Sequence, residues 1–224
     1  RSTGTGAVSL TGTGGLGTQF NYGMVIQNTN NLASTTITIG TNTGPLDLVG
    51  TSGSGTDRFG IAFYNKSTLS SSGGGAITMT TDDIDIVGNT SIQTSGLATI
   101  VQKTAGTNIN LGGPDVSGTL GLTDAELDFV TAGTLNIGDA NSGTITVSAG
   151  ITRPATTNLV CGPRILRASA PHSAARTLTW SPPVIWPSAW ERIFGSTSPV
   201  RRSIASTTNS TSSARTTSLA SIWP

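Results

Sequence analysis

The sequence has few of the residues on which many proteins depend for cross-links, metal ligands and charge. It contains one cysteine and one histidine among 224 residues, and only 5% of its residues are aromatic and 10% are charged. A single cysteine cannot form an internal disulfide, and a thiolate metal site needs several cysteines or histidines at short spacing. We therefore expect a fold that relies on neither disulfides nor a thiolate metal site.

Long apolar runs are also missing. No uninterrupted apolar segment approaches the roughly 20 residues that span a bilayer, and no basic stretch followed by an apolar run opens the chain. We therefore expect no membrane insertion of this segment. Because the sequence starts at Arg1 and not at a methionine, we expect a fragment of a longer protein.

Composition changes sharply near Thr152. Residues 1–152 hold 27 of the 29 glycines and carry ten acidic against four basic residues, a net charge of −6. Residues 153–224 hold all four tryptophans and carry eight arginines against one glutamate, a net charge of +7. The sequence therefore predicts an ordered segment over 1–152 and a low-order basic tail, rich in Pro, Ser, Thr and Arg, over 153–224.

Short runs in the first segment alternate apolar with small or polar residues. This is the period of a strand with one buried face. Glycine- and asparagine-rich clusters, which accept the positive φ of tight turns, separate the runs. The pattern predicts an all-β segment over about residues 7–150. Twelve alternating aliphatic residues are predicted to face mainly inward: Ile37, Ile39, Leu46, Leu48, Ile84, Ile86, Ile109, Leu111, Leu135, Ile137, Ile145 and Val147.

Two stretches recur at nearly the same spacing. Val8–Thr13 is similar to Leu46–Thr51, and Tyr22–Asn28 is similar to Phe59–Asn65, at offsets of 38 and 37 residues. Repeats of this length are typical of stacked structural units.

A looser similarity relates residues 105–112 to residues 132–138, at an offset of 27. Unequal offsets favour a solenoid, in which loops vary in length, over a propeller, whose blades need matched lengths. The predicted fold is a parallel β-helix with coils of roughly 20 to 25 residues. An immunoglobulin-like sandwich is the rival architecture, because short strands and turn signals also describe it.

Three stretches of residues 106–152 carry a family resemblance. They are Leu122–Leu127, Val130–Asp139 and Gly143–Ser148. These stretches resemble the haemagglutinin-like repeats of large secreted bacterial exoproteins, the filamentous-haemagglutinin type of adhesin and related autotransporter passengers. The resemblance implies a right-handed parallel β-helix that forms the stalk or adhesive surface of a cell-surface protein, without catalytic residues.

The same resemblance implies a location and a set of partners. The segment would be extracellular or on the bacterial cell surface, associated with the outer membrane. It would contact neighbouring repeats of the parent chain and a protein or glycan on a host or neighbouring cell. We expect no enzymatic activity, no cofactor and no nucleic-acid partner.

Two acidic clusters are the strongest candidates for chemistry. In each cluster, acids at alternate positions would share one face of a strand, as in β-helix polysaccharide lyases and hydrolases that bind calcium or use acid–base catalysis. A carbohydrate-active β-helix enzyme is therefore the alternative function. Such enzymes also need a base nearby, and the few bases of residues 1–152 are widely separated, so we favour a solvated polar face. The clusters are Asp82, Asp83 and Asp85, and Asp124, Glu126 and Asp128.

Other motifs fit turns better than sites. Residues 139–143, Asp-Ala-Asn-Ser-Gly, resemble the start of a calcium loop but lack its closing glutamate, and they predict an Asx turn. Cys161 and His172 have no partners at metal-site spacing, and Arg201-Arg202 belongs to no nucleic-acid-binding motif. The sequence thus assigns no catalytic, cofactor-binding or metal-binding residue.

The basic tail has two interpretations. Tryptophan has a single codon, and reading the tryptophan-rich stretch over 179–190 two bases later permits a Gly-Asp turn between two alternating strands. Residues 153–224 are therefore either a genuine Pro/Arg/Ser-rich linker or a frameshifted read of further repeats. In both cases we expect no regular repeat from about residue 155 onward.

Overall fold

The structure is a computed structural model, and it describes residues 2–28, 36–153, 157–162 and 166–168. The predictions for His172, the four tryptophans, Arg201-Arg202 and the frameshift lie outside the described residues. Of residues 166–168 only the backbone is described.

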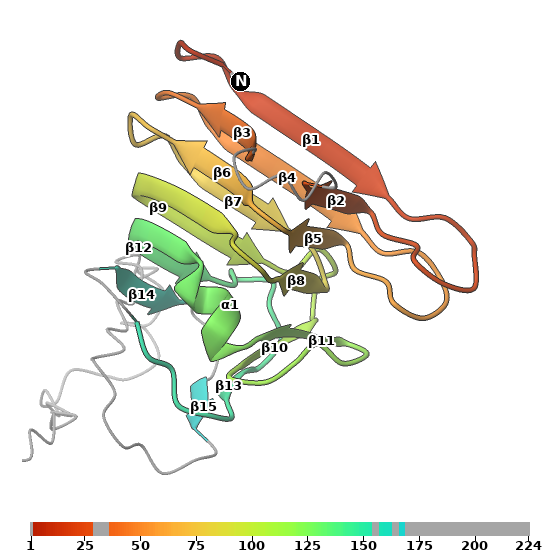
Figure 1. The fold of residues 1–224 in the computed structure, drawn as a ribbon. Helices are drawn as coiled ribbons and strands as arrows, with labels where there is room; N and C mark the ends of the chain where they lie inside the picture. Colours follow the sequence, from red (N-terminus) through yellow and green to blue (C-terminus); the bar gives the residue numbers. More distant parts are fainter. Residues whose placement is uncertain (1, 29–35, 154–156, 163–165, 169–224) are drawn as a thin grey trace, which may run out of the picture. The chain divides into compact units, whose positions relative to one another are not determined.

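The described residues form fifteen strands and one short helix (Figure 1). In the described part of the chain, no helix is long and apolar enough to cross a membrane. The elements are β1 (Val8–Thr13), β2 (Met24–Gln27), β3 (Ile37–Thr41), β4 (Leu46–Thr51), β5 (Ile61–Tyr64), β6 (Ser67–Ser71), β7 (Ile77–Thr80), β8 (Ile84–Ile86), β9 (Ser91–Val101), β10 (Asn108–Leu111), β11 (Thr119–Leu122), α1 (Asp124–Asp128), β12 (Val130–Ile137), β13 (Ile145–Val147), β14 (Asn158–Cys161) and β15 (Leu166–Ala168).

The strands form three sheets, and every pairing between named strands is parallel. The first sheet follows the order β1-β4-β7-β9-β12-β14. In the same sheet, β6 pairs with β9, and β3 pairs with β6. The second sheet is β2-β5-β8, and the third is β11-β10-β13-β15. The protein is therefore all-β with a large parallel sheet. An immunoglobulin-like sandwich does not fit, because its sheets are antiparallel.

The strand registers confirm the closer sequence repeats. Each residue of β1 pairs with the residue 38 positions later in β4, from Val8 with Leu46 to Thr13 with Thr51. Met24 of β2 likewise pairs with Ile61 of β5, 37 positions later. Residues that resemble one another are stacked on one another because each occupies the same position relative to the core.

The looser similarity does not correspond to a pairing. Residues 108–111 form β10 in the third sheet, whereas residues 130–137 form β12 in the first sheet. The spacing of paired residues in the first sheet also varies more than predicted, from 21 between Ile77 and Ala98 to 38 between Val8 and Leu46. The loops between strands absorb this variation, since loops tolerate insertions.

Two ladders of inward-facing residues run across the first sheet. Parallel pairing places side chains of one face directly above one another, so each ladder buries a continuous apolar surface. Each fully buried Leu or Ile stabilises the fold by roughly 1.5–3 kcal/mol. The ladders are Val8, Leu46, Ile77, Ala98, Leu135 and Leu159, and Leu10, Leu48, Met79, Ile100, Ile137 and Cys161.

Ten of the twelve residues predicted to face inward are buried. The exceptions are Ile37, which is 39% exposed, and Ile39, which is half-buried. Both lie in β3, which among the described residues pairs with β6 alone. Inward alternation alone therefore does not bury a residue. An edge position does not by itself explain the exposure, because Ile84 and Ile86 are buried in β8, which also pairs with one strand among the described residues.

Two strands continue the sheets beyond residue 152. β14 pairs with β12, and β15 pairs with β13. Leu159 and Cys161 are buried, and burial raises the pKa of the Cys161 thiol to about 11. The prediction that packed repeats end near residue 155 is wrong for residues 158–161, whose Asn-Leu-Val-Cys sequence places Leu159 and Cys161 on one strand face.

Candidate functional site

Helix α1 begins at a capping box. The Thr123 hydroxyl accepts a hydrogen bond from the Glu126 backbone N–H at 3.3 Å, and the Glu126 carboxylate accepts one from the Thr123 N–H at 2.8 Å. The pair satisfies two donors that a helix start leaves unpaired. The prediction that Asp124, Glu126 and Asp128 share a strand face is therefore wrong. The Thr-x-x-Glu pattern was the helix signal that the strand prediction missed.

Carboxylates bind the edge of β8 that faces away from β5. The Ile84 N–H donates to Asp115 Oδ2 at 2.8 Å, and the Ile86 N–H donates to Glu126 Oε1 at 3.3 Å. Among the described residues, β8 pairs with no strand on this side. The two carboxylates thus occupy the place that backbone carbonyls of a next strand would take.

The same carboxylates also bind the elements that follow. Asp115 Oδ1 accepts from the Gly121 N–H of β11 at 2.6 Å, and Glu126 Oε2 accepts from the Thr123 hydroxyl at 2.7 Å. Asp115 therefore joins β8 to β11, and Glu126 joins β8 to α1. We call Asp115 and Glu126 together the carboxylate bridge.

The environment of the bridge favours the protonated acids. Burial raises the pKa of Asp115 to about 7, although hydrogen bonds from Gly121 and Ile84 oppose the change, and the charges of Glu126 and Asp83 add to it. Burial likewise raises the pKa of Glu126, and the nearby Asp85 carboxylate adds to the effect. Desolvation disfavours a charged carboxylate more than these hydrogen bonds favour it.

A cavity of about 500 Å³ lies beside the bridge. Its walls combine carboxyl groups with aromatic and aliphatic side chains, and no basic side chain belongs to the lining within the described ranges. The lining residues are Phe59, Ile84, Asp85, Ile86, Val87, Gly88, Pro114, Asp115, Thr123, Ala125, Glu126 and Phe129.

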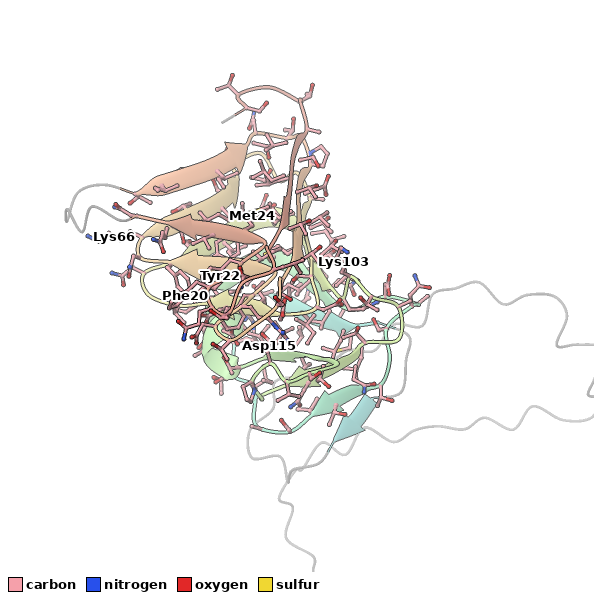
Figure 2. The ribbon with its side chains drawn as sticks, turned by 90° about the vertical axis from the view of Figure 1, so that its right-hand side faces the viewer. Phe20, Tyr22, Met24, Lys66, Lys103 and Asp115 are labelled. Carbon is pink, nitrogen blue, oxygen red and sulfur yellow. The ribbon has the colours of Figure 1, made fainter. Side chains whose placement is uncertain are left out.

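An aromatic cluster adjoins the cavity. Tyr22 stacks on Phe59, with ring centroids 6.2 Å apart and ring planes 11° apart, and it also contacts Tyr64. Phe20 lies on another side of Tyr22, with ring centroids 6.4 Å apart (both labelled in Figure 2). The Tyr64 hydroxyl donates to Asp85 Oδ2 at 2.8 Å, which orients this carboxylate. Burial, with this hydrogen bond, raises the pKa of Tyr64 far above its ordinary value, so it remains a donor at neutral pH.

Only Asp85 and Glu126 of the predicted acidic clusters meet at this cavity. Three of the other acids accept hydrogen bonds elsewhere, each from different backbone groups at turns or strand ends. Their backbone donors are Lys103 and Thr104 for Asp82, Gly60 for Asp83, and Thr152 for Asp124. Asp128 is exposed.

The turn predicted at residues 139–143 is confirmed. Asp139 Oδ1 accepts from the Asn141 N–H at 2.8 Å, which is an Asx turn, and from Gln102 Nε2 at 2.6 Å. Burial alone would raise the pKa of Asp139, but these hydrogen bonds outweigh it and lower the pKa. In the described part of the chain, no group of three or more His, Cys, Asp or Glu residues could hold a metal ion.

Sequence reasoning missed Asp115 as a functional candidate. Its donors, Ile84 and Gly121, lie 31 and 6 positions away, so no local pattern marks the residue. Its role exists only once β8 and β11 are side by side.

No family model, curated protein or solved structure matches this chain. The resemblance to haemagglutinin-like repeats therefore stays a prediction.

Proposed function

We propose that the chain is a structural and adhesive repeat segment of a large secreted bacterial cell-surface protein, built as a right-handed parallel β-helix. The observation that supports this proposal is the parallel, in-register stacking of repeats, in which β1 lies on β4 and β2 lies on β5 residue by residue. Stacking of equivalent positions from one unit to the next is what a solenoid requires.

The order in which the chain visits the sheets also supports a coiled path. The chain passes from β4 in the first sheet to β5 in the second, returns to β6 and β7 in the first and proceeds to β8 in the second. Each return stacks a strand in parallel on its predecessor, at about 4.8 Å per unit. Such units lengthen a rod and present extended lateral surfaces.

The proposal specifies surroundings for the segment. It lies outside the cell or on the bacterial surface, associated with the outer membrane, and it contacts neighbouring repeats of the parent chain. Its sides meet a protein or glycan of a host or neighbouring cell. The aliphatic ladders stabilise it, so it needs no cofactor or metal for folding.

Two experiments test the two parts of this proposal. A crystal structure of the chain tests the coil, and a left-handed or open arrangement of the three sheets would overturn it. For adhesion, beads coated with the chain are offered to cultured epithelial cells, beside beads coated with the heat-denatured chain. We expect retention only on the folded chain, and equal retention on both coatings would overturn the adhesive role.

A carbohydrate-active enzyme is the second candidate. The observation that favours it is that Asp85, Asp115 and Glu126 line one cavity while Asp115 has a pKa of about 7, which suits proton transfer. Incubation with a polysaccharide panel and measurement of new reducing ends tests it. Activity that Asp115→Asn abolishes without loss of folding would replace the structural proposal.

A further inference from the structure

The cavity beside β8 carries carboxyl groups without counter-charges. Asp85, Asp115 and Glu126 line it, and no lysine or arginine lines it within the described ranges. Asp83 lies close enough to raise the pKa of Asp115 further, and Asp85 does the same to Glu126. The carboxyl groups therefore repel one another, and a positive charge placed in the cavity would relieve this repulsion.

The cavity also offers aromatic and aliphatic surface. Phe59 and Phe129 belong to the lining, together with Val87 and Pro114. Tyr22 stacks on Phe59 and limits the orientations of its ring. An aromatic ring attracts a cation at its face, and the apolar residues can cover an alkyl chain.

We propose that this cavity binds an organic cation, namely an ammonium or guanidinium group carried on an aliphatic chain. The charge would lie against the carboxyl side of the cavity and the alkyl part against Phe59 and Phe129. An anion is disfavoured because it would face carboxylates only. A bare metal ion is disfavoured because no group of three ligating side chains was found in the described part of the chain.

The geometry fits a ligand of this class. A volume of about 500 Å³ lies within the range of small-molecule sites and exceeds what one amine needs. Tyr64 holds the Asp85 carboxylate at 2.8 Å, so one charge is positioned before the ligand arrives. The inference does not depend on the solenoid or on adhesion, because it uses only the cavity and its walls.

Binding should strengthen as pH rises. Asp115 has a pKa of about 7, and the charges of Glu126 in α1 and of Asp83, just before β8, act on it. The Asp85 charge acts on Glu126. Below pH 6 Asp115 is mostly neutral, and above pH 8 it is mostly charged. A cation is attracted only to the charged form, so its affinity should rise across this interval.

The test is a titration of the full chain with n-butylammonium chloride, followed by backbone amide NMR shifts of Ile84, Ile86 and Gly121. n-Butylguanidinium tests the second cation, and uncharged n-butanol is the matched control for the alkyl chain. We expect saturating shifts with both cations, at least about tenfold weaker binding of n-butanol, and tighter cation binding at pH 8 than at pH 5.5.

Two variants test whether a carboxylate in the cavity wall, and not the net charge of the protein, attracts the cation. Asp85→Asn keeps an acceptor for Tyr64 but removes a charge from the wall, and it should weaken cation binding about tenfold. Asp47→Asn removes the same charge from β4, which does not line the cavity, and should leave the affinity unchanged. If Asp85→Asn does not fold, Phe129→Leu replaces it, because loss of the ring should weaken cation binding severalfold while retaining apolar volume.

Three results would overturn the inference. Equal binding of n-butanol would make the cavity an apolar site, and equal weakening by Asp47→Asn would reduce the effect to net charge. Binding of methyl β-glucoside, without binding of either cation, would identify a neutral saccharide site and favour the enzymatic candidate.

Discussion

The first sheet and the carboxylate bridge join successive segments of the chain by different means. In the first sheet, backbone groups of β4, β7 and β9 pair directly and the aliphatic ladders are buried beneath them. At the outer edge of β8, carboxylates replace the backbone of a next strand. We expect the first kind of junction to be insensitive to pH and the second to depend on the protonation of Asp115.

The edge of a parallel sheet needs hydrogen-bond acceptors where no further strand pairs with it. Backbone N–H groups of an edge strand require acceptors, and a buried donor left unpaired costs about 1–3 kcal/mol. Asp115 and Glu126 supply these acceptors but place carboxyl groups in a poorly solvated region. The raised pKa values are the consequence of this arrangement.

The largest expected effect comes from a charge in the aliphatic ladder. Ile137 is fully buried between Ile100 and Cys161. Ile137→Asp removes apolar burial and introduces an unpaired charge, so it should lower the free energy of unfolding by about 3–5 kcal/mol or prevent folding. Urea denaturation followed by circular dichroism measures this.

Asn136→Asp is the matched control, because it introduces the same side chain one position earlier, on the opposite strand face. Asn136 is half-buried, and we expect a loss below about 1 kcal/mol. Similar losses for the two variants would contradict the assigned facing of β12.

A smaller effect is expected from a methyl group at the stacked glycines. Gly50 pairs with Gly12, and a Cβ on Gly50 would lie 2.1 Å from the Gly60 carbonyl oxygen, which is backbone and cannot rotate away. Gly50→Ala should therefore cost about 1–3 kcal/mol, measured by thermal unfolding. Gly4→Ala is the control, because its Cβ would have no neighbour within 4 Å.

The carboxylate bridge should make stability depend on pH. The pKa of Asp115 is raised in the folded protein to about 7 from an ordinary value of 3.8, so its contribution is fully present below about pH 4 and is lost as pH rises through 7. Allowing for its partial exposure, we expect a loss of about 1–2 kcal/mol between pH 4 and pH 8.

Asp115→Asn tests this assignment because an amide does not titrate in this interval. Urea midpoints of the variant should change less between pH 4 and pH 8 than those of the unchanged chain. An equal pH dependence in both would assign the titration to another group, such as Glu126.

The sequence predicted the first sheet better than the bridge. The similarity of Val8–Thr13 to Leu46–Thr51 predicted their stacking because equivalent positions in a repeat meet the same core. The bridge was not predictable in this way, because Asp115 meets Ile84 only after the chain has folded.

The sequence predictions for residues 124–128 and 158–161 were wrong for different physical reasons. α1 was missed although Thr123 and Glu126 form a standard helix start, because alternating acids in a β-rich context favoured a strand. β14 was missed because the composition of the long tail outweighed four alternating residues, Asn158–Cys161, which pair with β12 once that strand is in place. Short elements are selected by their neighbours more than by their own sequence.

The smallest effect is expected at Ile37, where the prediction of inward packing was wrong. Ile37 is 39% exposed in β3, whereas Ile77 of β7, between β4 and β9, is fully buried. Ile37→Thr keeps a β-branched side chain and should change the free energy of unfolding by less than about 0.5 kcal/mol, because little apolar surface is lost. Ile77→Thr places a hydroxyl among aliphatic side chains and should cost about 2–3 kcal/mol. Urea midpoints measure both, and equal losses would mean that β3 is covered as completely as β7. A difference of the expected size would instead show that Ile37 lies outside the packed core that contains Ile77.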